Sequence, residues 1–137
     1  MKTRLNKIAA VLALVVGAMA IFAGIKVLLG NDPGYYVINW LPIYNYTAGI
    51  LTVFITAILI WSGHRLAMPA AVITISLHAI VMAILQTAYR DEVAPDSIQA
   101  MTVRLIVWAV ILSLLIVQRY VIARPTIKVV PESTPNP

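Results

Sequence analysis

A single histidine stands in the middle of a long apolar run, where it is well placed to do chemistry. The run extends over about residues 66–89, and His78 lies near its centre. An imidazole at that depth in a membrane can ligate a metal or haem, relay a proton or contact a substrate. It can equally form a neutral hydrogen bond between helices, with Thr52, Thr56 or a tyrosine as the partner. Because polar groups inside lipid usually face the interior of a bundle, we expect His78 to point inward and to take this structural role.

The other histidine does not complete a cofactor site. His64 lies at the far end of the preceding apolar run, roughly 15 Å from His78 along the membrane normal at ~1.5 Å per helical residue. One chain therefore cannot clamp a haem between its two histidines, and a haem would require a homodimer. The sequence contains no cysteine and no HExxH, P-loop or nucleophile-elbow motif. We predict no catalytic residue, no metal site and no cofactor, with quinone or haem as the alternative.

Charged and polar residues also gather around the connection between the last two apolar runs. In one interpretation they form an ion-pair clasp, in which Arg104 pairs with Asp91 or Glu92. In the other they form a cationic pocket that suits an anionic or quinone-like small molecule. The candidate ligand-binding residues are His78, Gln86, Arg90, Arg104, Lys26 and Trp40.

The first long loop, residues 30–43, is rich in aromatic residues, and more follow directly after it. The tyrosines and the tryptophan in this part of the chain are Tyr35, Tyr36, Trp40, Tyr44 and Tyr46. Tyrosine and tryptophan collect at membrane–water interfaces because one end of the side chain is apolar and the other is polar. We expect an interfacial anchor, and the alternative is an aromatic lid or a re-entrant segment over an outward-facing pocket.

The amino-acid composition indicates that the helices carrying these residues are surrounded by lipid. The chain of 137 residues is 61% hydrophobic and only 11% charged, whereas a soluble domain usually carries about 25% charged residues. The surplus apolar surface must therefore face a lipid bilayer. The net charge of +5 does not indicate a nucleic-acid partner, because the basic residues flank the apolar runs instead of forming one stripe.

Four apolar runs are long enough to cross a membrane, since a helix needs about 20 residues to span a core of ~30 Å. They cover about residues 8–29, 44–63, 66–89 and 101–121. Lysine and arginine favour the cytoplasmic side. The basic residues assigned to that side are Lys2, Arg4, Lys7, Arg65, Arg119, Arg124 and Lys128.

The sequence therefore predicts an all-α, integral membrane protein that forms an up-down-up-down four-helix transmembrane bundle with both termini cytoplasmic. It predicts a multi-pass protein of the cell membrane, the inner membrane if the source is a bacterium. Residues 1–124 form the transmembrane domain in this prediction. Residues 125–137 form a proline-containing tail that we expect to be extended or disordered.

Small and polar residues at spacings of three and four predict which helix faces approach one another, because membrane helices associate through close backbone contact. In the first two runs these residues are Ala10, Ala13, Gly17, Ala20 and Gly24, then Gly49, Thr52 and Thr56. In the last two runs they are Ser76, Ala79, Ala83 and Gln86, then Thr102, Ala109 and Ser113.

Three stretches of the chain resemble the DoxX-like group of small four-span membrane proteins. They are "GAMAIFAGIKVLLG" in the first run, "YTAGILTVFITAILIWSGHRLAMPAAV" through the second run and the following turn, and "SLHAI" around His78. The resemblance covers about 110 residues, all but the tail. It implies a four-helix membrane fold, and some proteins of this group are small subunits associated with quinone-linked redox enzymes.

These observations lead to three hypotheses for the function. The first is a non-catalytic accessory or oligomeric subunit of a membrane complex, with a second copy or another membrane protein as its partner. The second is a quinone- or haem-linked redox membrane protein of DoxX-like type. The third is a small-solute transporter or channel.

Overall fold

The computed structural model describes residues 2–123, and within them every regular element is helical. The helices are α1 (Lys2–Leu28), α2 (Leu41–Leu51), the π-helical segment η1 (Thr52–Thr56), α3 (Ala57–Trp61), α4 (Ala67–Thr87) and α5 (Pro95–Ala123). Because α2, η1 and α3 follow one another without a break, the chain forms four long rods. The predicted tail, residues 125–137, lies outside the described residues.

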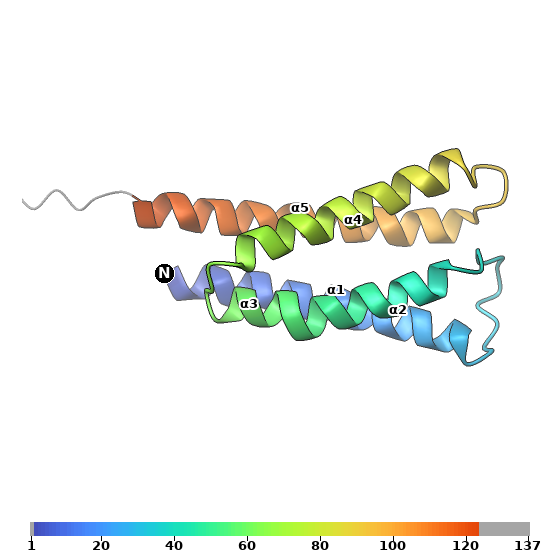
Figure 1. The fold of residues 1–137 in the computed structure, drawn as a ribbon, viewed down its shortest axis with the longest axis horizontal. Helices are drawn as coiled ribbons and strands as arrows, with labels where there is room; N and C mark the ends of the chain where they lie inside the picture. The colour runs from blue at the N-terminus through green and yellow to red at the C-terminus, as the bar shows by residue number, and fades with distance from the viewer. Residues whose placement is uncertain (1, 124–137) are drawn as a thin grey trace, which may run out of the picture.

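The four rods lie side by side and alternate in direction along the chain (Figure 1). The beginning of α1, the α3–α4 turn and the end of α5 meet at one end, which we call the terminal end. The α1–α2 loop and the α4–α5 turn meet at the opposite end, which we call the loop end. The predicted all-α class and the alternating arrangement of four helices agree with this structure.

Each rod is long and apolar enough to cross a membrane. The four candidate spans are Arg4–Leu28, Leu41–Trp61, Ala67–Thr87 and Pro95–Tyr120. The last one begins about two turns before the apolar run that predicted it, because Pro95 and Asp96 are well suited to the first turn of a helix although they are not suited to lipid. Large apolar side chains are exposed on every rod, among them Phe22, Phe54, Ile73 and Ile106.

The rods α1 and α2 make the closest backbone approach, as their small residues predicted. All the predicted small-residue positions on these two rods are buried. A Cβ atom added to Gly49 would lie 2.7 Å from the carbonyl oxygen of Gly17, and one added to Gly24 would lie 2.6 Å from that of Pro42. Glycine is required at both places because the facing obstacle is backbone.

The predicted inner faces of α4 and α5 were wrong. The residues expected on them are all exposed: Ser76, Ala79, Ala83, Gln86, Thr102, Ala109 and Ser113. The buried residues of α4 are instead Ala67, Ala71, His78, Val81 and Leu85, and those of α5 include Met101, Arg104, Trp108, Ile111 and Leu115. Positions 76 and 78 differ by about 200° around a helix, so the face of α4 that carries His78 is nearly opposite to the predicted one.

Two local interactions explain why the small polar residues of α5 need no neighbouring helix. The hydroxyl of Thr102 donates to the carbonyl of Ile98 and that of Ser113 to the carbonyl of Ala109, both at 2.8 Å. Their hydrogen-bonding capacity is used within α5 itself. The larger side chains of α5 therefore fill the bundle interior.

Candidate ligand-binding site

A layer of polar side chains crosses the bundle between two apolar clusters. One cluster lies toward the terminal end and contains Trp108 and Ile111, and the other lies toward the loop end and contains Leu85 and Met101. Among the described side chains of the four rods, the buried polar ones are Thr52, Thr56, His78, Ser97 and Arg104. The polar layer consists of His78 and Arg104, which lie between the two clusters, whereas Ser97 lies at the start of α5 near the loop end. Polar groups inside an apolar bundle are stable only when they find partners there.

The imidazole of His78 has such a partner on α2. Its Nδ1 atom and the hydroxyl of Tyr44 form a hydrogen bond of 2.5 Å. The predicted inward orientation is therefore confirmed, and the partner is a tyrosine. Thr56 is engaged elsewhere, with its hydroxyl 3.4 Å from that of Thr74.

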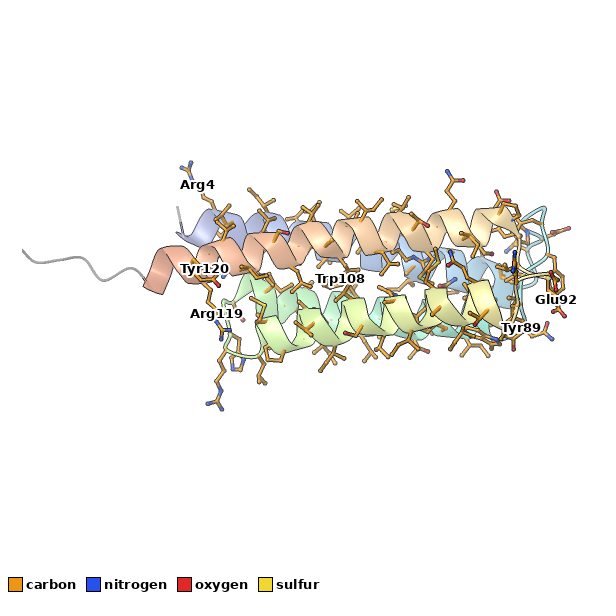
Figure 2. The ribbon with its side chains drawn as sticks, turned by 90° about the horizontal axis from the view of Figure 1, so that it is seen from above. Arg4, Tyr89, Glu92, Trp108, Arg119 and Tyr120 are labelled. Atoms are coloured by element: carbon orange, nitrogen blue, oxygen red, sulfur yellow. The ribbon has the colours of Figure 1, made fainter. Side chains whose placement is uncertain are left out.

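Aromatic rings extend from this pair along the bundle. The rings of Trp40 and Tyr44 lie edge to face with centroids 6.3 Å apart, and Tyr44 and His78 do so at 5.9 Å. On the other side of the imidazole the ring of Trp108 lies 6.4 Å away. Trp108 is completely buried near the middle of the bundle (Figure 2), and its indole nitrogen has no hydrogen-bond partner. Trp40, a predicted ligand contact, thus packs on Tyr44 and supports the site from the loop end.

The guanidinium of Arg104 is the charged group of the polar layer. Only 7% of this residue is exposed, and its Nη1 donates to the amide oxygen of Asn45 at 2.5 Å. Asn45 follows Tyr44 directly, so the beginning of α2 supplies one hydrogen-bond partner to α4 and another to α5. Asn45 was not among the predicted site residues, although it is the only amide side chain in the second span.

The structure gives Arg104 this partner in place of the carboxylates expected in the clasp. Asp91 and Glu92 are exposed in the α4–α5 turn, and Glu92 lies beyond the helices at the loop end (Figure 2). Arg104 is about two and a half turns into α5, because nine residues separate it from Pro95 at the helix start. An inward side chain at that depth is closer to α2 than to the turn.

A cavity of about 470 Å³ opens beside Arg104, between α1 and α5. Its wall is mainly apolar, with Tyr35 of the first loop as a further member. The lining residues are Leu12, Val15, Val16, Met19, Ala23, Tyr35, Asp96, Gln99, Ala100, Val103, Arg104 and Val107. Small-molecule sites are typically apolar cavities of about 300–1,000 Å³ with a few polar groups, and this cavity has those properties.

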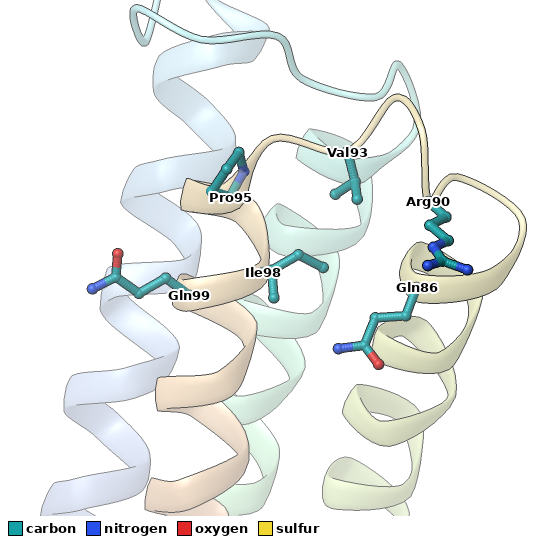
Figure 3. A pocket seen from close by; sticks show the side chains of 6 residues that line it. All are labelled: Gln86, Arg90, Val93, Pro95, Ile98 and Gln99. Carbon is teal, nitrogen blue, oxygen red and sulfur yellow. The ribbon is translucent and has the colours of Figure 1, made fainter.

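The remaining predicted ligand residues lie apart from this cavity. Gln86 and Arg90 line a separate hollow of about 670 Å³ at the loop end, across from Pro95, Ile98 and Gln99 of α5 (Figure 3). Lys26 is exposed, and its Nζ lies 5.5 Å from the centre of the Phe22 ring on the outside of α1. The single cationic pocket expected from the sequence is therefore divided, and only His78 and Arg104 belong to the interior polar layer.

No group of three residues able to hold a metal ion occurs among the described residues. His64 is exposed in the α3–α4 turn, where its Nδ1 accepts a hydrogen bond of 3.2 Å from the backbone of Leu66. The two histidines thus lie at different levels of the bundle, as the sequence predicted.

Comparison of the chain with protein-family models, curated proteins and solved structures finds no match. The resemblance to DoxX-like proteins stays a prediction.

Proposed function

We propose that this chain is a multi-pass integral membrane protein, placed in the cell membrane with both termini in the cytoplasm. Four long helices whose outer surfaces expose large apolar side chains support insertion. The orientation is supported by the basic residues, because Arg4, Lys7, Arg65 and Arg119 belong to the terminal end, whereas the loop end has Lys26 and Arg90. Lysine and arginine are retained on the cytoplasmic side.

Cysteine labelling tests this placement directly, because the natural sequence contains no cysteine. Glu92→Cys in the α4–α5 turn should react with a membrane-impermeant maleimide in intact cells. Ser62→Cys in the α3–α4 turn should react only after the membrane is permeabilised. The opposite pattern would refute the orientation, and recovery of the chain in the soluble fraction would refute insertion.

For the function itself, we propose a non-catalytic binding role, in which the cavity between α1 and α5 holds a small amphipathic molecule. The observation that carries this proposal is the burial of Arg104, a charged residue that lines a mainly apolar cavity. A charged donor beside an apolar wall matches a molecule with a polar head and an apolar body, either quinone-like or anionic. The imidazole of His78 and the guanidinium of Arg104 are each hydrogen-bonded to a residue of α2, Tyr44 and Asn45, which favours a binding role over a catalytic one.

Extraction of the purified protein with organic solvent tests the binding role. The unaltered protein should carry an amphipathic molecule in stoichiometric amount, which Ala100→Trp should lose because Ala100 lines the cavity and a tryptophan fills it. Ala109→Trp is the matched control, since Ala109 is also exposed on α5 but does not line the cavity. Identical extracts from all three proteins would contradict the proposal.

A second candidate function is that of an accessory or oligomeric subunit. It is favoured by the outward face of α4, where Ser76, Ala79 and Ala83 are exposed at the spacing that lets membrane helices approach closely. Mass measurement in mild detergent should then find a dimer or a stoichiometric partner. Substitution of Ala83 by a bulky residue such as leucine should dissociate it, and a strictly monomeric particle would oppose this candidate.

A further inference from the structure

We infer that the molecule in the α1–α5 cavity is a single-chain amphiphile with one negative charge, such as a free fatty acid. The inference rests on the proposed binding function and specifies its ligand class. In this arrangement the anionic head binds the guanidinium of Arg104, and the chain follows the cavity toward the terminal end.

The charge of Arg104 is the first reason. Arginine stays protonated in proteins, and only 7% of Arg104 is exposed. Its hydrogen-bond acceptor, the side chain of Asn45, is a neutral amide. Burial of a charge is costly unless an opposite charge compensates it. One monoanion would supply that compensation.

The described carboxylates do not supply it. Asp96 is the only acidic residue in the cavity wall, and it is exposed. It precedes Arg104 by eight residues on α5, which corresponds to ~12 Å along the helix. The guanidinium is hydrogen-bonded to the neutral amide of Asn45 and not to this exposed carboxylate, so Asp96 forms no direct ion pair that would compensate the charge of Arg104.

The distribution of polarity along the cavity gives the orientation of the ligand. The end nearest the loops is lined by Asp96 and Gln99, whereas Leu12 and Val107 line the opposite end. Long side chains on a helix point back toward its N-terminus, which places the guanidinium of Arg104 on the loop side of its own Cα. The head therefore lies toward the loop end and the chain toward the apolar end, as for a lipid of the outer leaflet.

Access to the cavity is from the side of the bundle. Met19 of α1 and Val103 of α5 both line it, although 61% and 47% of these residues are exposed. In a membrane these residues face the lipid, so an amphiphile already dissolved in the bilayer reaches Arg104 without crossing water. This favours a membrane-dissolved acid over a water-soluble anion.

Equilibrium binding to the full chain in phosphatidylcholine nanodiscs tests the inference. Tritiated dodecanoate is compared with tritiated dodecanol, above the pH at which the acid ionises, and binding to empty nanodiscs is subtracted. We expect dodecanoate to bind at least about tenfold more tightly than the alcohol, which corresponds to 1.4 kcal/mol. Arg104→Gln should abolish this preference, whereas Arg90→Gln, the same change at an exposed position, should keep it.

If Arg104→Gln folds poorly, the cavity-filling variant Ala100→Trp separates the two proposals. Loss of dodecanoate binding in Ala100→Trp, with binding retained in Ala109→Trp, would support the anionic ligand at this cavity. If acid and alcohol bind equally and both are lost in Ala100→Trp, the charge inference fails and the binding function stands. If neither probe binds above empty nanodiscs, the inference of an anionic amphiphile is refuted, and the solvent extracts of Ala100→Trp and Ala109→Trp decide the binding function separately.

Discussion

Replacement of Gly49 by alanine tests the contact on which the first half of the bundle depends. The new Cβ would lie 2.7 Å from the carbonyl oxygen of Gly17 and 2.8 Å from the backbone nitrogen of Ile21. Ordinary contact begins at 3.4 Å, so α1 and α2 must separate by several tenths of an ångström. Such overpacking costs about 1–3 kcal/mol, whereas the higher helix propensity of alanine returns about 1 kcal/mol. Because the obstacles at Gly49 include two backbone atoms, we expect a cost in the upper half of this range, about 2–3 kcal/mol, and therefore a net loss of about 1–2 kcal/mol.

The unfolding free energy can be measured by titrating SDS into dodecylmaltoside micelles, with tryptophan fluorescence and circular dichroism as probes. Gly17→Ala should lose less stability than Gly49→Ala, because its Cβ would meet side-chain atoms of Thr52 and Val53 that can adjust. Ala18→Gly, at an exposed position of α1, measures only the difference in helix propensity between alanine and glycine. A Gly49→Ala protein as stable as the original would refute the close contact between the backbones of α1 and α2.

Three further predictions concern the polar layer and the face of α4, and the same unfolding assay measures their effects on stability. Tyr44→Phe leaves the imidazole without its partner and should cost about 1–3 kcal/mol; no loss would mean that the hydrogen bond is not formed. Asn45→Asp places a carboxylate on Arg104 and should weaken dodecanoate binding while the fold is kept; stronger binding would contradict the charge argument. Ala71→Leu should destabilise the bundle by about 1–3 kcal/mol because Ala71 is fully buried, whereas Ala83→Leu on the exposed face should leave the stability of the single chain nearly unchanged. The reverse result would show that the face of α4 with Ala83 points into the bundle, as the sequence predicted.

The number and the approximate positions of the helices could be predicted from the sequence because they depend on composition over a whole run. About 20 apolar residues form a helix in lipid regardless of their neighbours, since every backbone polar group must be satisfied within the segment. The inner face of α1 was also predictable, because Gly17 and Gly24 permit an approach that larger residues would block. The inward orientation of His78 followed from the cost of leaving an imidazole in lipid.

Only the tertiary structure decided which face of α4 points inward and which residues complete the polar layer. Lipid and the bundle interior are both apolar, so hydrophobic periodicity does not distinguish an inward face from an outward one. The same small residues that line α1 therefore lie outside on α4, at Ala79 and Ala83. The pairing of Arg104 with Asn45 joins residues 59 positions apart, and such a contact depends on how α2 and α5 pack, which no local pattern in either helix contains.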